Sequence, residues 1–106
     1  DAVAMRADLA TAWTLDLPAA DEGAQARAQA LQDQAGMLLQ QMHQGLMVLT
    51  LTKEGRRQAL YYVVDEALTR QTLAPLLARP EAADAEIKVS FDPAWSGYFE
   101  YAGYLA

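Results

Sequence analysis

The sequence predicts an α+β fold, a ferredoxin-like βαββαβ sandwich. Its sheet is expected to be mostly antiparallel, with both helices on one face and an aromatic C-terminal tail. Three observations carry the prediction: Gly45–Val64 has two apolar arms around a charged turn, a long amphipathic stretch precedes it, and a helical stretch and an alternating stretch follow it. The order strand, helix, strand, strand, helix, strand is that of the split βαβ motif.

Length and composition bound the class of protein. A chain of 106 residues with 53% hydrophobic residues is predicted to be one domain, residues 1–106, with its own core. The formal net charge of −6 argues against nucleic-acid binding, which needs a basic surface, and against docking on anionic membranes. No apolar run approaches the roughly 20 residues that span a bilayer.

The chain contains no cysteine, which excludes a disulfide framework, a thiol nucleophile and a thiolate metal site. This composition fits a cytoplasmic protein, although a periplasmic location or a place within a larger chain is also compatible with it.

The first element is predicted as strand over Asp1–Leu17, where apolar and polar residues alternate. A weak turn signal at Ala10–Ala12 leaves two interpretations open, two strands or one long bent strand. Trp13 is expected in the core, and Pro18 ends the segment.

A helix is predicted from Asp21, a suitable N-cap, to about Gln44. Gly36 is expected to allow close approach to the sheet, and Gly45 is placed as the C′ residue. Six residues recur at helical spacing on an apolar stripe, and polar residues lie mostly off it. The stripe is Ala28, Leu31, Ala35, Leu38, Leu39 and Met42, and the polar set is Gln25, Arg27, Gln29, Gln32, Asp33 and Gln40.

The stretch Gly45–Val64 is predicted to be a β-hairpin with its turn at Lys53–Arg56, where Gly55 supplies a positive φ. The expected opposite pairs are Lys53 with Arg56, Leu51 with Gln58, Leu49 with Leu60, and Met47 with Tyr62. The more apolar face is expected to take the helices, and a slip of one residue would exchange the faces. That face is Met47, Leu49, Leu51, Leu60, Tyr62 and Val64; the other is Leu46, Val48, Thr50, Thr52, Arg57, Ala59, Tyr61 and Val63.

A second helix follows the hairpin, with two alternatives because of Pro75. It either begins after a Thr72 cap and runs to Arg79, or begins near Ala67 and continues through the proline. Pro80 stops it. Glu86–Phe91 is predicted as a strand, and Asp92 then caps a short turn. The aromatic residues of the tail are expected to pack on an edge or open face of the sheet.

Two motifs resemble those of a bacterial family of small domains of unknown function. One is the Gly-Arg-Arg turn Gly55–Arg57 leading into the aromatic pair Tyr61 and Tyr62. The other is Asp-Pro-x-Trp-x-x-Tyr at Asp92–Tyr98. The resemblance covers Gly45 to Leu105. It implies an α+β sandwich and no established activity. Members that lie beside a domain similar to bacterial inhibitors of ribonuclease E suggest regulation by protein binding.

The catalytic inventory is thin. His43 is the single histidine and is interpreted as a helix-end surface residue, and Ser90 and Ser96 have no recognisable partner. No nucleophile elbow or phosphate-binding glycine loop is present. We therefore predict no catalytic residue, no metal and no cofactor.

One constellation joins the hairpin to the tail: Arg56, Arg57, Tyr61, Asp92, Trp95 and Tyr98. Arginine between aromatic walls suits a carboxylate, a phosphate or a protein partner. The structural alternative is that Asp92 caps the tail while an arginine pairs with an acid or stacks on Trp95. The sequence thus favours a non-enzymatic protein-binding or regulatory module, with homodimerisation through the sheet as a variant. The alternative is a small-ligand or enzymatic domain with a pocket between hairpin and tail.

Overall fold

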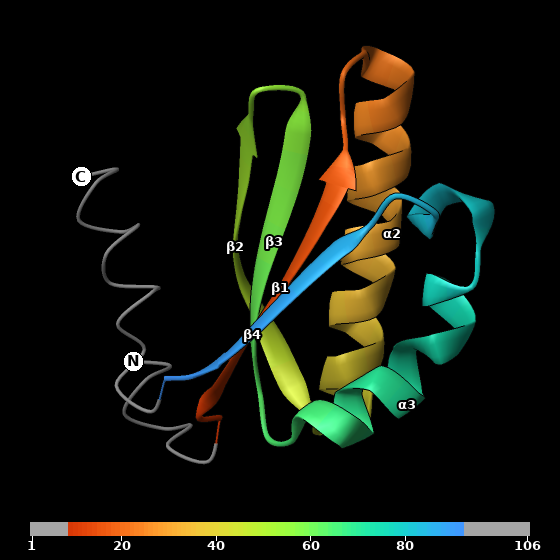
Figure 1. The fold of residues 1–106 in the computed structure, drawn as a ribbon. Helices are drawn as coiled ribbons and strands as arrows, with labels where there is room; N and C mark the ends of the chain where they lie inside the picture. Colours follow the sequence, from red (N-terminus) through yellow and green to blue (C-terminus); the bar gives the residue numbers. More distant parts are fainter. Residues whose placement is uncertain (1–8, 93–106) are drawn as a thin grey trace.

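The computed structural model describes residues 9–92 of the chain. Four strands form one antiparallel sheet in the order β2-β3-β1-β4, and the two α-helices lie on one face of it (Figure 1). The α+β, ferredoxin-like prediction is therefore confirmed, while the aromatic tail lies outside the described residues. The elements are β1 (Thr11–Pro18), α2 (Glu22–Gln41), β2 (Gly45–Lys53), β3 (Arg56–Val63), α3 (Glu66–Leu77), the short 3-10 helix η1 (Pro80–Ala82) and β4 (Glu86–Phe91).

Strand β1 is a central strand, paired with β3 on one side and β4 on the other. It begins at Thr11 and ends at Pro18, and the expected strand over residues 1–8 falls outside the described residues. Trp13 is fully buried, as predicted, and packs edge-on against Tyr61 with ring centroids 5.8 Å apart.

Helix α2 begins where the sequence predicted. The Asp21 carboxylate accepts a hydrogen bond from the Ala24 N–H at 2.7 Å, which satisfies a first-turn donor. The helix ends earlier than expected, at Gln41, and His43 takes the left-handed conformation with φ 56°. The assignment of Gly45 as the C′ residue was therefore wrong, because Gly45 is the first residue of β2.

The β2–β3 hairpin turns through Glu54 and Gly55, with φ of 53° and 77°. Two positive φ values in a two-residue loop are the mark of a type I′ turn, which matches the twist of the strands. The predicted register holds from Lys53 opposite Arg56 to Leu49 opposite Leu60. A β-bulge between Met47 and Leu49 then shifts the pairing, so that Met47 lies opposite Tyr61 and not opposite Tyr62.

The helices cover the hairpin face opposite to the predicted one. Ala59, Tyr61 and Val63 pack in the main core with residues of α2 and α3, whereas Leu60 and Tyr62 belong to a second cluster on the other face. The face assignment was wrong because β1 decides it: Trp13, Leu15 and Leu17 stand beside Ala59 and Tyr61, and together they form the larger apolar surface. The bulge brings Met47 to that side as well.

Helix α3 is the longer of the two alternatives and contains Pro75. Asp65 caps it by accepting from the Leu68 N–H at 2.8 Å, so the Thr72 cap was wrong. The Thr72 hydroxyl instead donates to the Gln44 side chain. Pro75 has no N–H for the carbonyl four residues back, but the apolar residues Leu73 and Leu76 remain buried on the sheet side.

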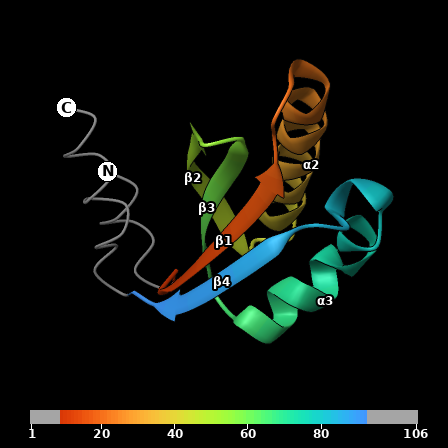
Figure 2. The ribbon, with the colours of Figure 1, turned by 45° about the horizontal axis from the view of Figure 1, so that its top comes forward.

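The main core lies between the sheet and the helices, which Figure 2 shows packed along one side of the strands. Gly36 permits this contact, since a Cβ there would lie 3.2 Å from Met47 Cβ. The predicted stripe of α2 supplies Ala28, Leu31, Ala35 and Leu39 as buried residues, but Met42 is 55% exposed because the helix has already ended.

Candidate functional site

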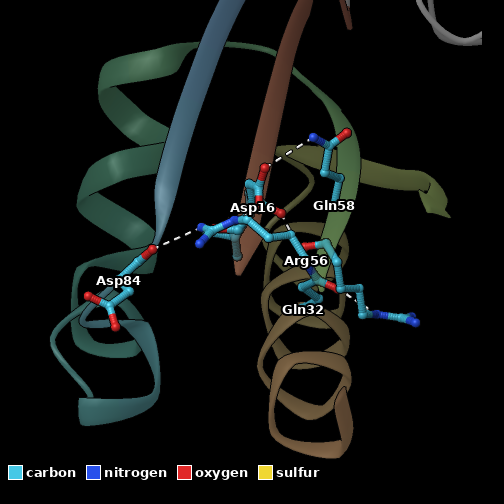
Figure 3. A network of polar contacts seen from close by, with 7 residues as sticks. Asp16, Gln32, Arg56, Gln58 and Asp84 are labelled. Carbon is cyan, nitrogen blue, oxygen red and sulfur yellow. Dashed lines mark hydrogen bonds and ion pairs between the residues drawn. The ribbon is translucent and has the colours of Figure 1, made fainter. Parts of the chain in front are cut away.

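A polar network lies on the sheet face opposite the helices, where β1 ends and β3 begins (Figure 3). Its centre is Asp16, which is only 4% exposed. Arg56 Nε donates to Asp16 Oδ1 at 2.6 Å, and Gln58 Nε2 donates to Asp16 Oδ2 at 3.0 Å. Both carboxylate oxygens are therefore satisfied by neighbours on β3, which is what a buried charge requires.

Arg56 extends this network to the loop before β4. Its Nη2 donates to the carbonyl oxygens of Asp16, at 3.2 Å, and of Asp84, at 3.0 Å. The hydrogen bond to the Asp16 carboxylate raises the pKa of Arg56 above its ordinary value, and the nearby charges of Asp16, Glu86 and Asp84 add to this. The Arg56 guanidinium thus links the start of β3 by hydrogen bonds to β1 and to the loop before β4.

A shallow hollow of about 370 Å³ lies beside the network. Its lining carries two acids and two bases, Asp16 and Glu54 against Lys53 and Arg56, so that it has no excess of either charge. Its most buried charged group, Asp16, is already bonded. The remaining lining residues are Leu51 and Gln58.

Arg57 and Tyr61 lie on the helix side and meet at Gln32 of α2. Arg57 Nε donates to Gln32 Oε1 at 2.7 Å, and the Tyr61 hydroxyl donates to the Gln32 carbonyl oxygen at 2.7 Å. Gln32 Nε2 in turn donates to the carbonyl oxygens of Leu15 and Arg57, at 3.0 and 2.9 Å. Burial raises the pKa of Tyr61 well above its ordinary value, and the charge of Asp33 adds to this.

The structure divides the predicted constellation between the two faces of the sheet. Arg56 and Arg57 are consecutive in a strand, so their side chains point to opposite faces. Tyr61 is fully buried under α2. Asp92 instead accepts a hydrogen bond at 2.6 Å from the hydroxyl of Tyr62, the residue that follows Tyr61. Trp95 and Tyr98 lie outside the described residues.

Two residues that organise these networks were not singled out from the sequence. Gln32 was placed off the apolar stripe but is fully buried. Its spacing contained the signal, because it lies four residues after Ala28 and three before Ala35, both of which are buried. In the sequence, Asp16 occupies an ordinary polar position of the alternating segment Asp1–Leu17. Only its pairing with Gln58 across the strands reveals its role.

A different feature is the free edge of β4. In the described chain β4 pairs only with β1, and its residues are exposed apart from the half-buried Ile87. The apolar side chains of Val89 and Phe91 are 37% and 77% exposed. The other edge strand, β2, is interrupted by its bulge, which is one way in which proteins protect an edge. Strand β4 pairs with β1 without a register shift over its whole length.

The hydrogen bonds show which backbone groups of β4 are turned outward. The Asp92 N–H donates to the Ala10 carbonyl oxygen at 2.6 Å. In an antiparallel ladder, residues alternate between facing the partner strand and facing away from it. The even-numbered residues of β4 therefore face β1, and the N–H and C=O groups of Ile87, Val89 and Phe91 point away from it.

A family model matches residues 17–102, with the description "Family of unknown function (DUF695)". The chain belongs to this family. The predicted membership in a family of unknown function is thus confirmed, and the match begins earlier in the chain than the resemblance did. No curated protein and no solved structure matches the chain.

Residues 9–92 of this DUF695 chain contain neither a candidate membrane span nor a candidate metal cluster. No helix there is long and apolar enough to cross a membrane. No group of three or more His, Cys, Asp or Glu side chains that could hold a metal ion occurs among residues 9–92.

Proposed function

We propose that this DUF695 domain is a non-enzymatic protein-binding module that acts by adding a strand at β4. The observation that carries the proposal is the outward backbone of Ile87, Val89 and Phe91 along an exposed, regular edge. An edge of this kind gives an incoming strand main-chain hydrogen bonds, and the side chains beside it give selectivity.

The side chains next to the edge support binding of another polypeptide. Val89 and Phe91 extend on the helix side of β4 and expose apolar surface. Glu86 and Lys88 are exposed on the other side. An added strand would cover the apolar side chains of Val89 and Phe91 and would contact the charged side chains of Glu86 and Lys88. The apolar contacts would stabilise the complex, and the charged contacts would favour a partner of matching charge.

The alternative of a small-ligand pocket has less support. The hollow near Arg56 is shallow, and two of its four charged groups, Asp16 and Arg56, are bonded to each other. Tyr61, a candidate wall of the predicted pocket, is sealed beneath α2.

A displayed library of random linear peptides tests the proposal. Selected peptides should shift the backbone amide resonances of Ile87, Val89 and Phe91 when added to the isotope-labelled chain. Val89→Pro removes an N–H that points away from β1, so it should abolish binding while leaving the β1 ladder intact. The matched control Val89→Thr keeps the N–H and should bind. Failure to select any peptide, or binding that survives Val89→Pro, would overturn the proposal.

A further inference from the structure

We infer that the strand added at β4 is β4 of a second copy of the chain, related by a two-fold axis that passes between the two Ile87 residues. The inference rests on the proposed function and names its partner. With the axis perpendicular to the sheet, the two sheets join into one continuous antiparallel sheet, and the helices of both copies lie on the same face.

The charges of β4 are complementary to themselves in this arrangement. Glu86 and Lys88 are two residues apart, so both side chains lie on the face opposite the helices. Antiparallel pairing centred on Ile87 places Glu86 of each copy opposite Lys88 of the other. Symmetry makes this pair twice, and directly opposite residues in a sheet interact at close range.

Neighbouring registers lack this match. Because the outward backbone groups belong to odd-numbered residues, odd residues must pair with odd residues. Centring on Lys88 sets two lysines opposite each other, and centring on Val89 sets Glu86 opposite Asp92 of the other copy. Centring on Ser90 sets Lys88 opposite Asp92 of the other copy, but the carboxylate of Asp92 already accepts from the Tyr62 hydroxyl.

The apolar side chains also fit the register centred on Ile87. Val89 then lies opposite Ala85 of the second copy, the residue directly before β4, so that a large exposed residue meets a small one. The extended pairing ends there, because Ala83 follows the 3-10 helix in a helical conformation with φ −59° and ψ −36°. The Ala85 N–H is already bonded to the Ala82 carbonyl oxygen at 3.1 Å. The Ala85 carbonyl oxygen is the group that accepts from Val89 of the second copy.

Charge exchange tests the register. We expect sedimentation equilibrium at about 0.15 M salt to show a dimer, since the Debye length there is about 8 Å and screens the repulsion between two acidic copies. Glu86→Lys and Lys88→Glu should each weaken the dimer roughly tenfold, because each changes a symmetric pair twice. The double variant should restore it. A double variant no tighter than the single ones would overturn the register.

Disulfide trapping gives a second measurement that does not depend on charge. The chain contains no cysteine, so single-cysteine variants report one contact each. Ile87→Cys should form a covalent dimer on oxidation. Val89→Cys should not, because four residues of strand, roughly 13 Å, would separate the two sulfur-bearing positions. Trapping by Val89→Cys in preference to Ile87→Cys would contradict the axis.

The outcomes separate the inference from the proposed function. A wild-type chain that is monomeric at high concentration, but whose selected peptides map to β4, would overturn the second copy as partner and leave strand addition standing. A dimer that persists in Val89→Pro would show association away from this edge and would overturn the inference. A dimer lost in Val89→Pro and retained in Val89→Thr would support both.

Discussion

Arg57 and Gln32 exchange hydrogen bonds across the interface between sheet and helix. Arg57 Nε donates to Gln32 Oε1 at 2.7 Å, and Gln32 Nε2 donates back to the Arg57 carbonyl oxygen at 2.9 Å. The same amide nitrogen reaches the Leu15 carbonyl oxygen at 3.0 Å. One buried side chain thus joins α2 to both central strands of the sheet.

Gln32→Leu is expected to lower the free energy of unfolding by about 2 kcal/mol. The leucine keeps most of the volume, but it removes both donations to the strand carbonyls and leaves the Arg57 guanidinium without this acceptor. Denaturant unfolding followed by circular dichroism measures the change. Gln29→Leu, at an exposed position of the same helix, is the control and should stay within about 0.5 kcal/mol. Equal losses in both variants would refute the role of Gln32.

The pair Asp16–Arg56 is expected to be energetically coupled. Arg56→Met leaves the Asp16 carboxylate buried with Gln58 as its remaining side-chain donor. We expect the free energy of unfolding to fall by about 2 kcal/mol. This loss is below the usual range for buried ion pairs because the Arg56 side chain is 33% exposed. The double variant with Asp16→Asn should lose less than the sum of the single variants, by about 1 kcal/mol or more. A double-mutant cycle from chemical denaturation measures this difference.

An exposed ion pair of equal length serves as the reference for that cycle. Arg70 Nε and Glu66 Oε1 are also 2.6 Å apart, with side chains 50% and 44% exposed. Arg70→Met should cost less than about 0.5 kcal/mol. If Arg70→Met lowers the free energy of unfolding as much as Arg56→Met does, then the burial of Asp16 does not set the strength of the Asp16–Arg56 pair.

Two glycines should respond oppositely to alanine. A Cβ at Gly45 would lie 2.8 Å from both the Tyr62 carbonyl oxygen and Val63 Cγ1, so Gly45→Ala should lower the melting temperature and cost about 2 kcal/mol. A Cβ at Gly23 meets side-chain atoms only, Arg27 Nη1 at 3.2 Å and Asp21 Oδ1 at 3.4 Å. Gly23→Ala should therefore be neutral or gain up to about 0.5 kcal/mol from helix propensity. Thermal unfolding of the two variants in parallel shows whether each substitution lowers or raises the melting temperature.

Stability is expected to fall as the pH rises above the ordinary tyrosine pKa of 10.0. Burial raises the pKa of Tyr61 in the folded chain, so above that pH the unfolded chain releases the phenolic proton while the folded chain keeps it. The contribution of the Tyr61 phenol to the free energy of unfolding is complete below the pKa that it has in the unfolded chain. This contribution is lost as the pH rises toward the pKa of Tyr61 in the folded chain, by at most about 1.4 kcal/mol per pH unit.

Urea unfolding of wild type and Tyr61→Phe across this pH range isolates the effect. The phenylalanine variant should be less stable at neutral pH by about 1 kcal/mol, because the hydrogen bond to the Gln32 carbonyl oxygen is lost. Its stability should then decline less steeply in alkali than that of wild type. Parallel curves would mean that Tyr61 does not titrate differently in the folded and unfolded chains.

Local chemistry made much of the chain predictable. Asp21 identified the start of α2, Gly55 identified the hairpin turn, and the alternation of Glu86–Phe91 identified β4 with its observed bounds. Each of these depends on residues within one turn or one strand, so the sequence alone contains the whole signal.

The prediction failed where distant segments decide the outcome. Whether Pro75 lies in the first turn of α3 or in its interior depends on where the helix begins, and so on how Leu73 and Leu76 pack on the core. The bulge that moves Met47 leaves no turn signal in the sequence. The grouping of the candidate site residues was wrong for a related reason. Arg56 and Arg57 were grouped because they are adjacent in sequence, yet adjacency in a strand sends their side chains to opposite faces.

The sequence by itself determined the order of elements, the N-cap of α2 and the turn that joins β2 to β3, since propensity, capping and hydrophobic period are local properties. Tertiary structure alone decided which hairpin face meets the helices, because that choice depends on Trp13, Leu15 and Leu17 of β1 packing beside Tyr61. It also decided that Asp16 and Gln32 are buried, and that the outward backbone groups of β4 belong to Ile87, Val89 and Phe91. These facts follow from strand order and register, which join residues far apart in the chain.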